Sequence, residues 1–220
     1  MGIIKMLSPD NVVFSVGGIY YLTIPGNVKV VTPQGSGLRD GSGWGNSMGL
    51  SELVKELEST AYSTTIYWLG AGTYALTDVI NLARNGITLY GGFNNTEISL
   101  DERDSYLNKT NFSGSNVTNI FDITNIKSLT IDGVNFINGH AKNCGALYVC
   151  NITFILKNCD LYDNVATGYG GAIYEENNSK VTLINCNIYD NTAGSGGGVY
   201  VNTGSTITTE NTDIYDNGPD

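Results

Sequence analysis

The sequence is poor in basic side chains and in histidine, and this limits what the protein can do. It has one histidine, His140, and 11 Lys and Arg residues against 21 Asp and Glu, which gives a net charge of −10. An acidic chain without a cluster of Lys or Arg repels phosphate backbones, so we expect no nucleic-acid partner. No run approaches the ~20 apolar residues of a membrane-spanning helix, so we expect no membrane span in this chain.

The cysteines and the first residues also lack familiar signals. The four cysteines contain no CxxC pair, and with a single histidine they predict no zinc site. Residues 1–10 (MGIIKMLSPD) lack a charged segment followed by a long apolar one. We therefore expect that an exported form of the protein has already lost its signal peptide.

What the sequence does contain is a repeat. Four near-copies of one pattern occupy residues 133–139 (GVNFING), 158–164 (NCDLYDN), 185–191 (NCNIYDN) and 211–217 (NTDIYDN). Their apolar anchors are 25, 27 and 26 residues apart, at Phe136, Leu161, Ile188 and Ile214. A second pattern keeps the same period at residues 145–148 (GALY), 171–174 (GAIY) and 197–200 (GGVY). A repeat of this length is one rung that must stack on its neighbours to bury its apolar residues.

The residues before each anchor predict strands. Short runs of β-branched and large apolar residues end in Asn, Asp or Gly, at residues 129–131, 154–156 and 181–183. Three short strands in each coil of ~26 residues predict an all-β fold, a parallel β-helix in which each coil pairs with the next. The expected stacks are Leu129/Phe154/Val181, Ile131/Leu156/Leu183 and the four anchors.

Stacking also places equal polar residues above one another. One repeat position holds Asn158, Asn185 and Asn211, and another holds Asn164, Asn191 and Asn217. Because an amide both donates and accepts, such columns can form hydrogen bonds along the axis. Cys159 and Cys186 also share a position, where parallel side-chain directions favour buried free thiols and a disulfide is the alternative.

One helical pattern lies upstream of the repeats. Leu50, Leu53, Val54 and Leu57 follow i, i+3, i+4, i+7 spacing, and Ser47 or Asn46 could cap the helix start. Because the end of a solenoid exposes strand edges and a bare core, we predict that this amphipathic helix caps the N-terminal end. An interaction helix is the alternative.

The chain is expected to form one continuous domain with three parts. Residues 1–33 form an N-terminal strand segment, in which residues 12–24 predict an apolar strand pair around Gly17 and Gly18. Residues 34–125 form the cap and irregular first coils, and residues 126–220 form the regular repeats.

The repeated elements resemble those of a known group. The interleaved GGA(I/V) and (F/L/I)xxN elements are similar to the repeats of polymorphic outer-membrane and adhesin-like proteins, although the first copy ends in Gly139 instead of Asn. Residues 41–44 (GSGW), 70–74 (GAGTY), 87–93 (ITLYGGF) and 96–104 (TEISLDERD) are similar to the start of large surface proteins of the pectate-lyase-like class. The resemblance covers about residues 28–220. It implies the right-handed form of the parallel β-helix, an extracellular or cell-surface location and adhesion. No catalytic pattern of the group can be carried over.

Two columns of tyrosines are candidate binding residues. Tyr162, Tyr189 and Tyr215 directly follow the inward anchors, so we predict that they face outward as an aromatic stripe for sugar rings or a protein partner. Ordinary surface packing is the alternative. For Tyr148, Tyr174 and Tyr200 the direction stays open, because Glu175 shares the next position with Val149 and Val201.

Acidic residues recur at Asp163, Asp190 and Asp216. Carboxylates one strand spacing apart repel unless a cation lies between them, so these three are a candidate Ca²⁺ site. Turn formation is one alternative, and a glycosidase acid pair ~5–10 Å apart is another. Stacked copies give such distances automatically, so we name no catalytic residue and no cofactor besides this Ca²⁺.

The sequence therefore favours a surface-displayed, adhesin-like β-helix without enzymatic activity that binds a host, cell or glycan partner. A carbohydrate-active enzyme (a polysaccharide lyase or hydrolase) and a phage-tailspike-like protein on the same scaffold are the alternatives. Because the chain stops just after the fourth repeat with no visible cap, we also expect a longer parent protein or an end-to-end contact there.

Overall fold

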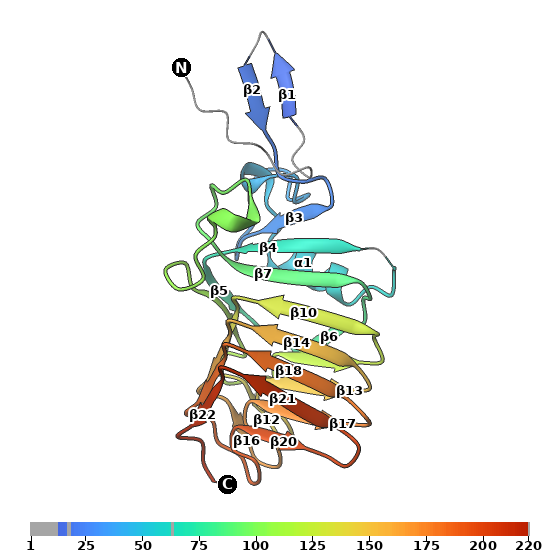
Figure 1. Ribbon diagram of the computed structural model, residues 1–220, viewed down its shortest axis with the longest axis vertical. Helices are drawn as coiled ribbons and strands as arrows, with labels where there is room; N and C mark the ends of the chain where they lie inside the picture. Colours follow the sequence, from blue (N-terminus) through green and yellow to red (C-terminus); the bar gives the residue numbers. More distant parts are fainter. Residues whose placement is uncertain (1–12, 17–18, 63, 220) are drawn as a thin grey trace.

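The computed structural model describes residues 13–16, 19–62 and 64–219, most of which form one elongated solenoid (Figure 1). Parallel strands stack along its long axis in three sheets of seven, six and five strands. The chain is thus an all-β parallel solenoid with coils of about 26 residues, as the repeat predicts. In the described residues no helix is long and apolar enough to cross a membrane.

The seven-stranded sheet runs along the whole solenoid. From the N-terminal end its strands are β3 (Val28–Val31), β4 (Thr65–Gly70), β7 (Ile87–Phe93), β10 (Ser128–Asp132), β14 (Thr153–Lys157), β18 (Lys180–Ile184) and β21 (Thr206–Glu210). Leu129 pairs with Phe154, and Phe154 pairs with Val181. The predicted stacks on this sheet are confirmed.

Two shorter sheets close each coil. The six-stranded sheet contains β5 (Gly72–Ala75), β8 (Thr110–Ser113), β11 (Asn135–Ile137), β15 (Asp160–Tyr162), β19 (Asn187–Tyr189) and β22 (Asp213–Tyr215). The five-stranded sheet contains β6 (Ile80–Leu82), β9 (Phe121–Thr124), β13 (Leu147–Cys150), β17 (Ile173–Glu176) and β20 (Val199–Val201). A short pair, β12 (His140–Ala141) and β16 (Val165–Ala166), lies between them in the chain. The four anchors pair in succession along the six-stranded sheet, as predicted.

The inward side chains of all three sheets form one apolar core. Tyr74, Phe112 and Phe136 form an aromatic column, with ring centroids 5.0 and 6.3 Å apart. Leu161 and Ile188 continue the column and are fully buried. Each such side chain contributes roughly 1.5–3 kcal/mol to folding, so the core stabilises every coil through its neighbours.

Asparagines shape the turns because they tolerate a left-handed backbone. Asn158 and Asn185 have φ values of 52° and 53° in the turn between the seven- and six-stranded sheets. Asn185 Nδ2 donates to Asn158 Oδ1 at 3.2 Å, and Asn158 Nδ2 donates to Asp132 Oδ1 at 2.7 Å. The predicted amide column at this turn is confirmed for these two residues.

A second amide column lies inside the solenoid. Asn164 Nδ2 donates to Asn191 Oδ1, and Asn191 Nδ2 donates to Asn217 Oδ1, each at 2.9 Å. Asn164 and Asn191 are almost completely buried. Because buried amides need partners, this predicted ladder fixes the stacking of the coils.

The stacked cysteines form no disulfide. Cys159 and Cys186 are free and buried, and their thiols lie 3.0 Å from the Lys157 carbonyl oxygen and 3.4 Å from that of Ile184. Burial raises the pKa of the Cys159 thiol. The predicted column of buried thiols is confirmed.

Helix α1 (Leu50–Leu57) covers the core near the N-terminal end (Figure 1). Leu53 and Leu57 are fully buried in the core, so the predicted apolar stripe is confirmed. The predicted N-cap residue of this helix, Ser47 or Asn46, is wrong. The N-cap is Gly49, whose N–H donates to Glu52 Oε2 at 3.0 Å. Ser47 is instead buried, because its hydroxyl bonds the Thr32 hydroxyl at 2.8 Å. Asn46 belongs to the short helix η1 (Trp44–Asn46).

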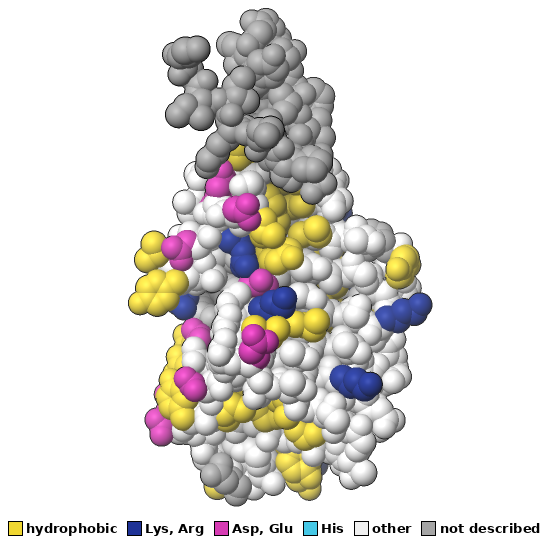
Figure 2. Space-filling model, in the orientation of Figure 1, with side chains coloured by type: hydrophobic (Ala, Val, Ile, Leu, Met, Phe, Trp, Pro, Cys, Tyr) yellow, Lys and Arg dark blue, Asp and Glu magenta, His cyan; other side chains and the backbone are white. Residues whose placement is uncertain are grey.

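A second apolar cluster lies on the outer face of the seven-stranded sheet near its N-terminal end. It is built on Val28, Val30, Trp68 and Phe93, and Trp68 stacks on Phe93 with centroids 4.8 Å apart. The segment 94–109, which contains η2 (Leu100–Glu102), leaves the solenoid and packs Leu100 against this cluster. Figure 2 shows hydrophobic side chains gathered on this face.

An antiparallel strand pair lies beyond β3 (Figure 1). It consists of β1 (Val13–Val16) and β2 (Ile19–Leu22). The strand pair predicted within residues 12–24 is confirmed where the structure describes it, and Val12, Gly17 and Gly18 lie outside the described residues.

Candidate functional site

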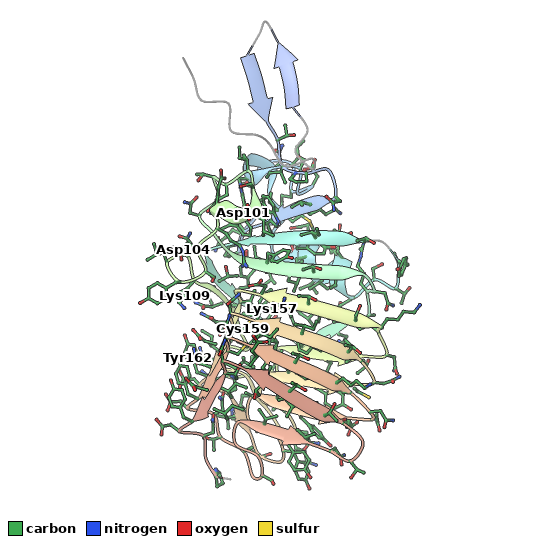
Figure 3. The ribbon with its side chains drawn as sticks, viewed as in Figure 1. Asp101, Asp104, Lys109, Lys157, Cys159 and Tyr162 are labelled. Atoms are coloured by element: carbon green, nitrogen blue, oxygen red, sulfur yellow. The ribbon has the colours of Figure 1, made fainter. Side chains whose placement is uncertain are left out.

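The outer face of the six-stranded sheet carries the tyrosine stripe, Tyr162, Tyr189 and Tyr215. Leu161 and Ile188 point inward and are fully buried, so alternation along β15 and β19 turns the tyrosines outward. Figure 3 shows Tyr162 at the edge of the solenoid, directed away from it. The predicted outward direction is confirmed, and a role in binding stays a prediction.

The rings of the tyrosine stripe cover one another. Tyr162 and Tyr189 have centroids 5.0 Å apart and an interplanar angle of 9°, and Tyr189 and Tyr215 have 5.3 Å and 10°. Parallel rings this close must overlap face to face, because coplanar rings would collide. Except at the end ring, Tyr215, which is 47% exposed, a ligand would therefore meet ring edges and hydroxyl groups. Burial and the Asp160 carboxylate raise the pKa of Tyr189 to about 12, so its hydroxyl stays protonated at neutral pH.

A row of amides and carboxylates runs beside the tyrosine stripe. Asn135 Nδ2 donates to Asn111 Oδ1, and Asn187 Nδ2 donates to Asp160 Oδ1, each at 2.9 Å. Lys109 Nζ lies 3.3 Å from Asp160 Oδ2. Because these groups satisfy one another, the row stabilises the stacking of coils.

The candidate metal ligands Asp163, Asp190 and Asp216 follow the tyrosines in exposed turns. Their φ values of 56°, 53° and 50° lie in the left-handed region that Asp tolerates. Over the residues that the structure covers, no three His, Cys, Asp or Glu side chains form a group that could hold a metal ion. The backbone conformation explains the three aspartates as turn residues. The Ca²⁺ site stays a prediction.

A second set of tyrosines projects from the five-stranded sheet. Tyr148, Tyr174 and Tyr200 are neighbours on β13, β17 and β20, and they face outward because the alternate residues Val149 and Glu175 are fully buried. The direction that the sequence left open is thereby settled. Their rings are tilted by 60° and 73° at centroid distances of 5.6 and 5.4 Å. Tyr169 packs against this set, with its ring centroid 6.0 Å from that of Tyr174 and 4.6 Å from that of Tyr200.

A cavity of about 480 Å³ opens beside these rings, and we call it the tyrosine groove. Its wall is formed by Asn119, Asp122, Ala141, Lys142, Asn143, Tyr148, Tyr174 and Glu176. Glu176 accepts hydrogen bonds from the hydroxyls of Tyr148 and Tyr174, the latter at 2.9 Å. Asn119 Nδ2 donates to Asp122 Oδ1 at 2.6 Å. One ligand can thus reach aromatic surface, two carboxylates, amides and one ammonium group.

The two acids of the tyrosine groove interrupt the repeat. Asp122 pairs with Tyr148 of the following coil. Glu176 pairs with Cys150 of the preceding coil. Because neither acid recurs, neither was predicted as a site residue, although an acid that appears once in a repeated column was the available signal. Burial raises the pKa of Asp122, while the hydrogen bond from Asn119 opposes that shift.

An acid beside the groove residues points inward. Glu175 lies between Tyr174 and Glu176 on β17, pairs with Val149 and Val201, and is fully buried. In the described part of the chain neither carboxylate oxygen has a hydrogen-bond partner. Burial raises the pKa of Glu175 to about 8, so the group is mostly protonated at neutral pH.

Comparisons with protein-family models, with curated proteins and with solved structures found no match to this chain. The parallel solenoid is established by its strand pairing. The resemblance to adhesin-like and pectate-lyase-like surface proteins rests on the sequence elements alone.

Proposed function

We propose that this protein is a rigid solenoid that binds a glycan, with the tyrosine groove as its binding site. The observation that carries the proposal is one cavity bordered by Tyr148 and Tyr174 together with Asp122 and Glu176. Sugars present apolar ring faces edged by hydroxyl groups, which aromatic faces and planar carboxylates complement.

A surface-displayed, adhesive role outside the cell belongs to the same proposal. It is supported by the resemblance of the repeats to those of adhesin-like proteins. The solenoid suits adhesion because each coil is fixed by two neighbours, so outward side chains are held on a stiff scaffold.

A polysaccharide hydrolase or lyase is the second candidate, and one observation favours it. Asp122 and Glu176 share one cavity but have different surroundings: burial raises the pKa of Asp122, whereas Glu176 accepts two tyrosine hydroxyls. Such a difference is how one site assigns an acid and a base.

The test is a glycan array of the purified chain, run with a reducing-end assay on the same glycans. Tyr174→Ala and Tyr189→Ala are a matched pair, since each removes one outward tyrosine. Tyr174 lies on the five-stranded sheet and Tyr189 on the six-stranded sheet. We expect Tyr174→Ala to weaken binding about tenfold and Tyr189→Ala to leave it unchanged. Glu176→Gln, which keeps the side-chain shape, should also weaken binding.

Each outcome separates the candidates. Loss of binding in Tyr189→Ala alone would move the site to the tyrosine stripe, and absence of any bound glycan would overturn the proposal. If the chain releases reducing ends and Glu176→Gln stops this release, the protein is an enzyme that cleaves glycans and not an adhesin.

A further inference from the structure

A second cavity lies near the N-terminal end of the solenoid, and we call it the cap pocket. It measures about 750 Å³, within the range of small-molecule sites. Its walls come from the segment after β3, the start of β5 and the loop that follows β7, and they include Gln34, Trp44, Thr73 and Asn95. None of the residues that line the cap pocket carries a charge. The tyrosine groove has two carboxylates and an ammonium group, so the two sites suit different ligands.

The loop that presents Asn95 is held by Glu97, which is 4% exposed. Its Oε1 accepts the Asn94 N–H at 2.7 Å, and its Oε2 accepts the Thr96 N–H at 3.0 Å. Asn95 lies between these residues with φ 75°, and its side chain packs on the backbone of Gly70, where a Cβ would lie 2.0 Å from Asn95 Oδ1. The position of Asn95 is therefore fixed by the fold.

Trp44 supplies the aromatic wall of the cap pocket. Its Nε1 donates to the Glu97 carbonyl oxygen at 2.8 Å, so the same residue holds the loop and the indole. The indole packs on Phe93 with centroids 5.6 Å apart, and Phe93 stacks on buried Trp68. Trp44 is half-buried: its ring rests on the outer apolar cluster, and the residue also lines the cavity.

The polar side chains of the cap pocket fall into two sets. The hydroxyls of Thr32, Ser36 and Ser47 bond one another at 2.8 and 3.1 Å and hold the wall together. Within the described residues, the side chains of Gln34, Thr73 and Asn95 form no hydrogen bond, and all three are exposed at the cavity. Two amides and a hydroxyl are thus free to bind a ligand.

We propose that the cap pocket binds a neutral sugar unit, which packs on Trp44 and receives hydrogen bonds from Gln34, Thr73 and Asn95. An indole face with uncharged donors and acceptors matches a sugar ring with hydroxyl groups and gives no partner to a charged ligand. This site is separate from the tyrosine groove and does not depend on the function proposed there.

An extended peptide fits the cap pocket less well, because the neighbouring strand edge is occupied. Val30 N–H donates to the Gly41 carbonyl and Met48 N–H donates to the Val30 carbonyl, both at 3.0 Å. Thr32 N–H donates to the Met48 carbonyl at 2.9 Å. A peptide therefore cannot add a strand to β3 on this side.

The experiment uses tryptophan emission, since the chain has two tryptophans and Trp68 is only 3% exposed. The full chain and its Trp68→Phe variant are titrated with the methyl glycosides of glucose, galactose, mannose and N-acetylglucosamine, each up to its solubility limit. We expect a saturable emission change with at least one sugar in both proteins. Asn95→Ala should weaken the binding of that sugar about fivefold, because one hydrogen bond is worth about 1 kcal/mol.

The control variant is Asn119→Ala, which removes an amide from the tyrosine groove and should leave the emission titration unchanged. Gln34→Ala is the second test variant, because an exposed side chain is removed there without strain on the loop. No saturable response to any of the four sugars would overturn the proposal. The same would follow from a response that Asn95→Ala and Gln34→Ala leave intact, or from a response to an uncharged peptide alone.

Discussion

Glu175 occupies a place inside the solenoid where the neighbouring coils have Val149 and Val201. Its carboxyl group is removed from water and gains no hydrogen bond from any residue in the described part. Burying an unpaired carboxyl group costs free energy, most of all when it is ionised. The single residue that departs from the apolar column is therefore a source of instability.

The first prediction is that stability falls as the pH rises from about 5 to about 8. Burial raises the pKa of Glu175 from its ordinary 4.5 to about 8, so in this range the folded protein keeps a proton that the unfolded chain has lost. The contribution of Glu175 is complete below pH 4.5 and is lost as the pH rises to the folded pKa. Glu175→Val should remove this slope and raise the urea midpoint at pH 8, as measured by circular dichroism.

Glu175→Gln separates charge from polarity. It should also flatten the slope, because it cannot ionise, yet it should be less stable than Glu175→Val, since the amide is still buried without partners. Equal slopes in the wild type and in Glu175→Val would show that the buried carboxyl group does not control the pH dependence.

Among the secondary-structure elements, helix α1 is tied to the solenoid by a partly buried acid, Glu56. Glu56 forms ion pairs with Lys29 and, at 3.6 Å, with Arg84, and it accepts the Tyr67 hydroxyl at 2.5 Å. Burial alone would raise the pKa of Glu56, but Lys29, Tyr67 and Arg84 together lower it below its usual 4.5. Its contribution to stability is present above pH 4.5 and is lost as the pH falls through the lowered pKa.

The second prediction follows from this anchor. Glu56→Gln should lower the free energy of unfolding at pH 7 by about 1–2 kcal/mol, because it breaks a partly buried charge network. The matched control is Glu58→Gln at the exposed C-cap of the same helix, which should change stability little, because the amide oxygen can still accept the Asn81 N–H. Urea unfolding at pH 7 and pH 4 gives the comparison, and equal losses in the two variants would contradict the proposed anchor.

The strands were predictable because the sequence repeat determines which residues of neighbouring strands pair. Once Phe136, Leu161 and Ile188 are aligned, the pairing of the other residues in those strands follows. The helix start was not predictable in this way. Ser47 is buried in a hydrogen bond with Thr32, a residue far from it in the sequence, so the N-cap is Gly49, whose N–H donates to Glu52.

The tyrosine groove and the cap pocket could be predicted only in part. The repeat brings Tyr148 and Tyr174 together. Whether they face inward or outward could not be predicted, because the next residue, Glu175, is a charged residue that lies inside the core. The cap pocket has no repeat to guide it, because Trp44 and Asn95 meet through loops whose paths depend on buried Glu97. Sequence patterns therefore locate the scaffold better than the sites on it.

For the whole molecule, stability should be close to a sum over coils, because each strand pairs only with those of the adjacent coils. Lys157 pairs with Ile184, so deleting residues 158–184 places Asn185 directly after Lys157, where Asn158 stands in the intact chain. Phe136 and Ile188 would then meet as Phe136 and Leu161 do now. The cut removes one complete coil and leaves matching surfaces on both sides.

The third prediction is that this shortened chain folds. Its circular dichroism per residue should be unchanged, and its urea m-value should fall by roughly one eighth, because the deletion removes 27 of 220 residues and m scales with the surface exposed on unfolding. Deleting residues 158–170 instead joins Lys157 to Gly171 and puts inward residues out of register, so that variant should lose its cooperative transition. If both deletions fail alike, the coils are not interchangeable, and the stability of the solenoid depends on contacts beyond nearest neighbours.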